Sequence, residues 1–144
     1  MPPQDPTTPR EHAIDIRVRY CECDPMGVAH HSVFAVWFEM GRTELLRQTG
    51  QAYRDLEAEG VLLAVVSLQV KFRLPARYDD VLTLTTRLVK TGHVKIEHDY
   101  ELRRGSDVLA TASTTLACLD RDGRARALPA DLSEWPALIS EKTA

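Results

Sequence analysis

The sequence lacks the features of a nucleic-acid-binding protein and those of a membrane-spanning one. Its 144 residues carry a formal net charge of −3, whereas nucleic-acid-binding domains usually carry a basic excess. A membrane-spanning helix needs about 20 consecutive apolar residues, and no run in the chain approaches that length. We therefore expect neither nucleic-acid binding nor membrane insertion.

Cysteine is scarce as well. The chain has three cysteines, and Cys21 and Cys23 stand two positions apart, which does not make a disulfide framework. Residues 1–12 are rich in proline and contain no apolar segment, which predicts a disordered arm rather than a secretory signal. Residues 13–144 have the size of one domain. Together these features predict a single-domain protein of the reducing cytoplasm.

Alternating apolar and polar residues, by contrast, are frequent. This pattern has the period of a half-buried strand, and it recurs at residues 14–20, 66–74, 82–88, 94–102 and 108–116. Turn-forming residues such as Gly92 and Gly105 separate the later segments. Connections this short favour antiparallel pairing, because parallel neighbours need a crossover of about a dozen residues or more.

One long segment, residues 33–49, has its apolar residues at helical spacing instead. Ser32 suits its N-cap, and Gly50 suits the position after its end. The first two turns are apolar nearly all round, which predicts a helix buried on most sides. The chain is therefore expected to be α+β, with a five-stranded antiparallel sheet wrapped around one long helix. Shorter helices are expected at residues 52–59 and after Pro129.

The candidate chemistry lies between the first strand and this helix, in the stretch YCECDPMGVAHH. It presents an aromatic residue at Tyr20, then Glu22, Asp24 and Gly27. This order resembles the hotdog thioesterases of the 4-hydroxybenzoyl-CoA thioesterase type, which include Tol–Pal-associated acyl-CoA thioesterases. The resemblance extends to further segments of the chain, which are Phe38-Glu39, Arg42-Thr43-Glu44, residues 75–80 and Leu128-Pro129.

The resemblance implies hydrolysis of an acyl-CoA thioester, without a cofactor or a metal. Asp24 matches the family's catalytic aspartate, which acts as nucleophile or as general base for water. The backbone N–H of His31 matches the donor that polarises the thioester carbonyl at the start of the helix. Gly27 permits a backbone conformation and a close ligand approach that a Cβ would obstruct. The family also implies a homodimer or homotetramer with active sites between subunits.

The phosphates of CoA require basic groups near the site. The candidates are Lys90, His93 and Lys95 around the Gly92 turn, together with Arg73. The alternative is that this hairpin is simply a solvated polar turn. Whether the carrier is CoA or acyl carrier protein stays open.

Glu39 on the long helix has two readings. It suits an ion pair with Arg42, three residues later. Alternatively it binds substrate or acts as the catalyst, since a related hotdog branch uses a helix carboxylate. Val33, Glu22 and His30 depart from the family pattern, which leaves the acyl group undetermined.

The sequence suggests three alternatives to a thioesterase with a catalytic aspartate. Cys21, Cys23, His30 and His31 supply zinc-type ligands, but a Cys-x-Cys pair and adjacent histidines lack the usual spacing. A catalytic cysteine paired with histidine has no third group to orient it. A non-catalytic protein that binds acyl-CoA or an acyl carrier is the alternative on the same fold.

Overall fold

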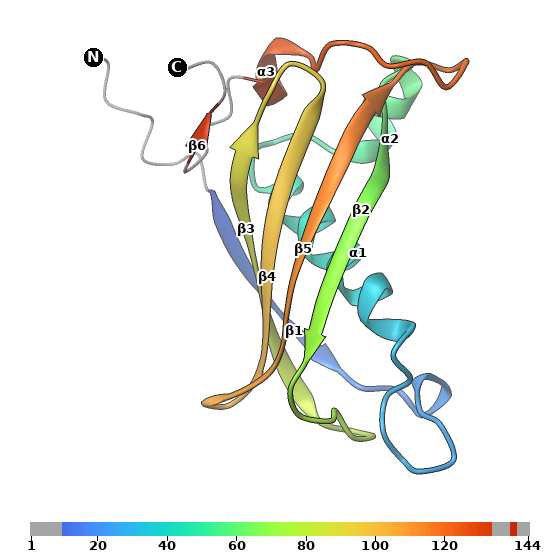
Figure 1. Cartoon of the computed structure of the whole chain (residues 1–144), viewed down its shortest axis with the longest axis vertical. Coiled ribbons are helices and arrows are strands. Elements are labelled where there is room, and N and C mark those ends of the chain that lie inside the picture. Colours follow the sequence, from blue (N-terminus) through green and yellow to red (C-terminus); the bar gives the residue numbers. More distant parts are fainter. Residues whose placement is uncertain (1–9, 134–138, 141–144) are drawn as a thin grey trace.

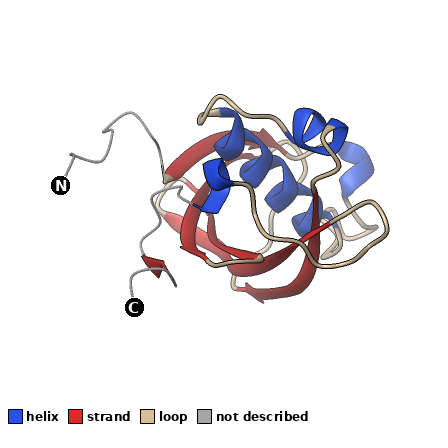
Figure 2. Cartoon of the chain, turned by 90° about the horizontal axis from the view of Figure 1, so that it is seen from above, coloured by secondary structure: helices blue, strands red, loops and turns tan. Residues whose placement is uncertain are grey.

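The computed structural model describes residues 10–133 and 139–140. Its sheet holds five long antiparallel strands in the order β1-β3-β4-β5-β2, and a two-residue strand, β6, pairs in parallel with β3. The strands are β1 (Glu11–Arg17), β2 (Leu62–Phe72), β3 (Val81–Thr91), β4 (Lys95–Arg104), β5 (Asp107–Leu119) and β6 (Ile139–Ser140). The sheet curves around one long helix, α1 (Val33–Arg47), as Figures 1 and 2 show. The predicted architecture is confirmed.

Three shorter helical segments complete the described chain. The helices α2 (Tyr53–Ala58) and α3 (Ala130–Ser133) occur where the sequence predicts them. A single 3₁₀ turn, η1 (Tyr20–Glu22), follows β1. Tyr20 therefore lies in this turn and not in the strand that the alternation predicted. The chain leaves the sheet after Arg17, and this turn directs it toward the loop that precedes α1.

The first strand also begins earlier than predicted. β1 starts at Glu11, so Glu11 and His12 belong to the sheet, although the sequence placed them in a disordered arm. Their pairing with β3 explains the difference, since Glu11 lies opposite Arg87 and their side chains form an ion pair at 3.4 Å. A polar sequence can still form an edge strand when its partner supplies cross-strand contacts. Residues 1–9 of the predicted arm lie outside the described residues.

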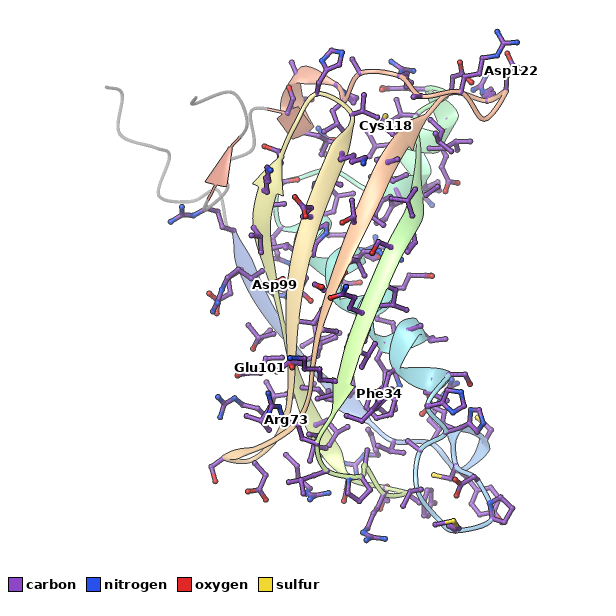
Figure 3. The ribbon with its side chains drawn as sticks, in the orientation of Figure 1. Phe34, Arg73, Asp99, Glu101, Cys118 and Asp122 are labelled. Carbon is purple, nitrogen blue, oxygen red and sulfur yellow. The ribbon has the colours of Figure 1, made fainter. Side chains whose placement is uncertain are left out.

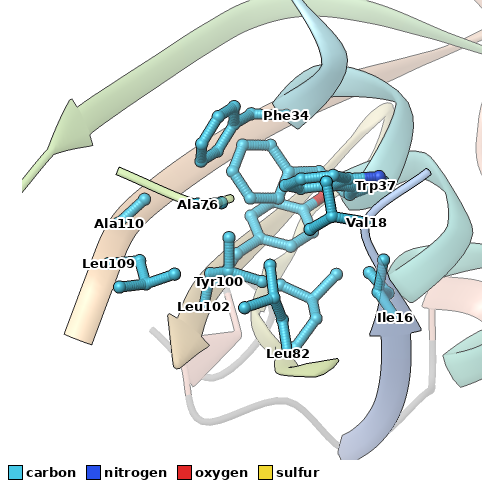
Figure 4. Close-up of a cluster of buried hydrophobic side chains, with 12 residues drawn as sticks. Ile16, Val18, Phe34, Trp37, Ala76, Leu82, Tyr100, Leu102, Leu109 and Ala110 are labelled. Atoms are coloured by element: carbon cyan, nitrogen blue, oxygen red, sulfur yellow. The ribbon is translucent and has the colours of Figure 1, made fainter. Parts of the chain in front are cut away.

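The core between α1 and the sheet consists of two hydrophobic clusters. The first contains Phe34, Trp37 and Phe38 of α1 (Figure 4). The second contains Leu45 and Leu46 from the end of the same helix. Burying side chains of this size contributes about 1.5–3 kcal/mol each, so these clusters hold α1 on the sheet.

A polar layer separates the two clusters. On α1, β3, β4 and β5, a buried polar residue stands between a residue that packs in the first cluster and one that packs in the second. We define this layer by its buried members, which are Arg42, Thr86, His98, Thr114 and the hydroxyl of Tyr100. Tyr100 Oη and Thr114 Oγ1 are hydrogen-bonded at 2.7 Å. Buried polar side chains at positions that would normally be apolar indicate a role other than packing.

The prediction that α1 is buried on most sides is wrong for one face. Val36 is 51% exposed and Met40 is 43% exposed, because the sheet covers the opposite face of the helix. Ser32 occupies the N-cap position without capping the helix, and its hydroxyl lies 2.8 Å from His30 Nδ1 instead. The helix ends at Arg47 and not at residue 49 as predicted, so Gly50 does not directly follow it. Gly50 has a φ of 88°, in the left-handed region that favours glycine.

Strand β2 lies at the open edge of the sheet. Its register against β5 shifts between Val65 and Ser67. Large apolar side chains on and just beyond it are exposed, namely Val65, Val66, Leu68, Phe72 and Leu74. The sequence predicted that one face of this strand would be buried. In the described chain this face is covered only in part. Val70 packs against the first cluster and the Phe72 ring lies edge-on to that of Phe34 of α1, whereas Val65, Val66 and Leu68 stay exposed.

Candidate active site

The loop between η1 and α1 is closed by backbone hydrogen bonds like a short hairpin. His30 N donates to Glu22 O at 2.9 Å, and Asp24 N donates to Val28 O at 2.9 Å. Cys23 and Ala29 form a bridge between these two bonds. The loop therefore fixes Asp24 relative to the first residues of α1, at the end of the sheet that is lowest in Figure 1.

The Asp24 carboxylate is partly exposed and has one oxygen engaged. Oδ1 accepts hydrogen bonds from the backbone N–H groups of Met26, at 2.8 Å, and Val28, at 3.4 Å. Within the described chain, Oδ2 has no hydrogen-bond partner. The first contact is a turn that an asparagine could also make, whereas the second oxygen is available to a reacting group.

Gly27 and the turn before β3 hold the loop from the other side. Gly27 has a φ of 79°, which side chains with a Cβ rarely adopt. Ala29 N donates to Ala76 O at 2.7 Å, and Tyr78 N donates to Gly27 O at 3.4 Å. Two segments far apart in sequence, both of which carried the family resemblance, thus pack against each other.

His31 stands at the N-terminal end of α1, as the sequence predicted. Its ring is exposed and stacks on that of His30, with centroids 4.2 Å apart. The described residues offer no acceptor to its backbone N–H. A free N–H at a helix N-terminus is a suitable donor to a developing oxyanion.

Glu22 anchors this loop to the helix. Its side chain is buried, with Oε1 accepting from Arg19 N at 2.7 Å and Oε2 accepting from the Trp37 indole N–H at 3.0 Å. Burial by itself raises the pKa of Glu22. The bonds from the Arg19 backbone and guanidinium and from the indole outweigh that effect, so the pKa lies below its usual value. The carboxylate stays ionised and tied to α1.

Glu39 forms the ion pair with Arg42 that its spacing allowed. Its Oε2 lies 4.0 Å from Arg42 Nη2, and its side chain is 71% exposed while that of Arg42 is 10% exposed. Both residues line a groove of about 260 Å³ between α1 and β2. Glu39 is therefore on the rim of a cavity and not within the core.

The candidate CoA-binding cations lie elsewhere. Lys90, His93 and Lys95 belong to the β3–β4 hairpin, at the opposite end of the sheet from Asp24 (Figure 1). The 11-residue strand β3 separates the two ends, a span of about 35 Å at ~3.3 Å per residue. Within one chain these cations and Asp24 do not form a single site.

Arg73 lies near the end of β2 (Figure 3) and lines a second, polar groove of about 420 Å³. The strand residues of this groove, such as Thr85 and Glu101, alternate with buried ones. The groove therefore faces away from α1, and Arg73 is not directed toward the groove beside the helix.

The zinc and cysteine alternatives concern the cysteines and histidines of the loop. No three His, Cys, Asp or Glu side chains within the described residues are arranged to hold a metal. The pKa of the Cys23 thiol is raised by burial and by the carboxylates of Glu22 and Asp24. A raised pKa lowers the fraction of nucleophilic thiolate.

Comparison with known proteins gives the family. The model of the thioesterase-like superfamily matches residues 18–136, which include the loop, α1 and β2 to β5. The chain belongs to this superfamily. An acyl-CoA thioesterase of Haemophilus influenzae, YbgC, is 31% identical over 73% of this chain and 78% of its own length. The acyl-CoA thioester hydrolase YbgC of Escherichia coli O157:H7 is 29% identical over 79% of this chain and 87% of its own length.

Solved structures confirm the hotdog fold. The DHNA-CoA thioesterase of Staphylococcus aureus is 28% identical and superposes with a TM-score of 0.78, covering 85% of this chain and 82% of its own. A Thermus thermophilus protein, TT1821, is 37% identical with a TM-score of 0.81, covering 86% and 98%. Within the described residues, no helix has both the length and the apolar character needed to cross a membrane.

Two features of the structure were not predicted from the sequence. The Glu22–Trp37 contact joins residues 15 positions apart and left no sign in the local pattern. The polar layer did leave a sign, because Thr86, His98 and Thr114 stand where the alternation requires apolar residues. Polar residues at such positions could have indicated a buried polar site.

Proposed function

We propose that the protein hydrolyses an acyl-CoA thioester to a free acid and CoA, with Asp24 as the catalytic carboxylate. The observation that carries this proposal is the Asp24 loop. Among the described residues, one oxygen of the Asp24 carboxylate has no hydrogen-bond partner, and the loop ends at His31, whose backbone N–H has no acceptor there. The loop thus offers a base or nucleophile and an oxyanion donor. Membership of a superfamily with acyl-CoA thioesterases supports the substrate class.

Two routes use the same groups. In the first, Asp24 attacks the thioester carbonyl, the C–S bond breaks to release CoA thiolate, and water hydrolyses the resulting mixed anhydride. In the second, Asp24 removes a proton from water, which attacks the carbonyl itself and displaces CoA. In both routes the His31 N–H stabilises the negative charge on the carbonyl oxygen. A loop aspartate in this role is what the resemblance to the 4-hydroxybenzoyl-CoA thioesterase type, including the Tol–Pal-associated thioesterases, implies.

The assembly is proposed to be a homodimer formed through β2, with a tetramer as a further step. In the described part of the chain the outer edge of β2 pairs with no strand. This strand exposes Val66 and Leu68, and the neighbouring face of α1 exposes Val36 and Met40. Exposed apolar edge strands favour pairing with another strand. A second copy related by a two-fold axis would lie against both surfaces and enclose the groove between α1 and β2.

Such a dimer bears on CoA binding as well. When two β2 strands pair antiparallel, the two chains point in opposite directions. One end of the first chain then lies beside the other end of the second chain. The β3–β4 hairpin of the second copy would then lie toward the Asp24 end of the first. A role for Lys90, His93 and Lys95 in phosphate binding therefore depends on the dimer.

The proposal is tested by incubating the purified protein with a panel of acyl-CoAs and measuring the thiol released. The panel spans short aliphatic, long aliphatic and aromatic acyl groups, and each is repeated with the same acyl group on acyl carrier protein. Turnover of at least one acyl-CoA is expected. Tight binding of acyl-CoA without thiol release from any member would contradict hydrolysis and support the non-catalytic alternative.

A further inference from the structure

The groove beside α1 changes character along its length. Near the helix N-terminus it is lined by Ala35 and Val36 of α1. Farther along, Glu39 and Arg42 of the helix converge with Thr114 of β5, which pairs with Leu68 of the edge strand. Val65 lies beyond them, toward the C-terminal end of α1. An apolar cleft with a few convergent polar groups is typical of a small-molecule site.

The groove is in line with the proposed reaction centre. Residues 35, 39 and 42 recur at spacings of four and three, so they lie on one face of α1. His31 stands directly before Ser32, the N-cap residue of this helix. From Val33, the first residue of α1, to Glu39 the helix rises by about 9 Å, at ~1.5 Å per residue. An extended acyl chain of medium length, such as decanoyl, spans that distance from a carbonyl bound at the His31 N–H.

Among the polar side chains of the groove, Arg42 and Thr114 are fixed by their surroundings, whereas Glu39 is mostly exposed. Arg42 is buried, and its guanidinium acts on two buried tyrosines: burial raises the pKa of Tyr53 to about 12 and also raises the pKa of Tyr100, while the guanidinium opposes both shifts. Thr114 is fixed by its hydrogen bond with Tyr100. Glu39 is the ion-pair partner of Arg42 in the described chain, yet it is 4.0 Å away and mostly solvated.

We propose that this groove binds the acyl chain of the substrate and that Glu39, Arg42 and Thr114 bind a hydroxyl group at the chain's far end. This inference rests on the proposed function. A hydroxyl can donate to the Glu39 carboxylate and accept from the Arg42 guanidinium or from Thr114. A methyl end would desolvate these charged groups without replacing their hydrogen bonds. A terminal carboxylate would meet the negative charge of Glu39.

The test compares decanoyl-CoA, ω-hydroxydecanoyl-CoA and ω-carboxydecanoyl-CoA, which differ only at the chain end. The full-length protein is expected to show a kcat/KM at least about tenfold higher for the hydroxy compound than for decanoyl-CoA. The carboxy compound is expected to fall below the hydroxy compound. Equal values for decanoyl and hydroxydecanoyl, or preference for the carboxylate, would overturn the inference.

Variants locate the effect. Glu39→Leu should bring the hydroxy-to-decanoyl ratio close to one, and Thr114→Val should lower it. The matched control is Glu44→Leu, which breaks a similar pair with Arg47 at 3.2 Å on the same helix but outside the groove. This control should keep the ratio of the parent. A Glu39→Leu variant that keeps the full ratio would contradict the inference.

Failure of the proposed function can be distinguished. If the parent hydrolyses none of the three compounds, that function fails, and the dissociation constants from calorimetry then test the groove alone. The same tenfold preference for the hydroxy compound is expected in binding. Equal dissociation constants would overturn the groove assignment as well.

Discussion

Glu22 Oε2 accepts a 3.0 Å hydrogen bond from the indole N–H of Trp37, and this contact fastens the Asp24 loop to the central helix. The other oxygen of the same buried carboxylate accepts from Arg19 N. Both oxygens are thus acceptors. No orientation of a glutamine side chain can reproduce that pattern, because its amide would point a donor at a donor.

Glu22→Gln is therefore expected to lower the free energy of unfolding by about 1–3 kcal/mol, the cost of a buried unsatisfied donor. Chemical denaturation measures this change. Trp37→Phe removes the indole donor, so the double variant should lose less stability than the two single variants added together. Strict additivity would show that the contact does not hold the loop.

Gly41 allows α1 to approach β3 closely. A Cβ at this position would lie 2.3 Å from Thr86 Oγ1 and 2.8 Å from Leu84 Cδ2. Gly41→Ala should therefore destabilise the protein by about 1–3 kcal/mol, although alanine has a helix propensity about 1 kcal/mol better than that of glycine. Thermal or chemical denaturation decides the sign, and Thr86→Ala in the same chain should restore part of the loss. A stabilised Gly41→Ala variant would contradict the close packing.

His98 makes stability depend on acidity. Burial, with a smaller contribution from Arg42, lowers the pKa of His98 to about 3, whereas an unfolded histidine has a pKa of about 6.5. Between these values the unfolded state binds the additional proton, so acidification favours unfolding. Stability from this residue is present above about pH 6.5 and is lost as the pH falls toward the folded pKa.

The change of the free energy of unfolding with pH can be measured. His98→Leu removes the titrating group, so between about pH 6 and pH 4 its free energy of unfolding should fall by about 1.4 kcal/mol less per pH unit than that of the parent. Denaturation curves at a series of pH values compare the two slopes. Identical slopes would mean that His98 is not buried as a neutral side chain.

A charge on the open edge of the sheet should prevent assembly. Val66 on β2 is 55% exposed, and Val66→Lys is expected to give a monomer by sedimentation at micromolar concentration. Val81→Lys is the matched control, since Val81 is 47% exposed on a strand with partners on both sides. The control should keep the assembly of the parent. A monomeric parent protein would contradict the proposed dimer outright.

The sequence predicted the fold well because each long strand and α1 carries its own periodicity. It could not predict that Val66 and Leu68 stay exposed in one chain, since alternation reports an apolar face and not what covers it. The motif identified Asp24, Gly27 and His31 as neighbours because the loop is local. It could not place Lys90, Lys95 or Arg73, whose positions depend on strand lengths and on which face each side chain takes.

The most direct test of the account is the turnover of Asp24→Asn beside that of Glu39→Gln on the same acyl-CoA. Asparagine keeps the Met26 N–H turn contact but is neither base nor nucleophile, so kcat should fall by at least ~10²-fold with the fold and ligand affinity retained. Glu39→Gln should keep measurable turnover. Near-normal turnover in Asp24→Asn with an inactive Glu39→Gln would contradict the account and assign catalysis to the helix carboxylate.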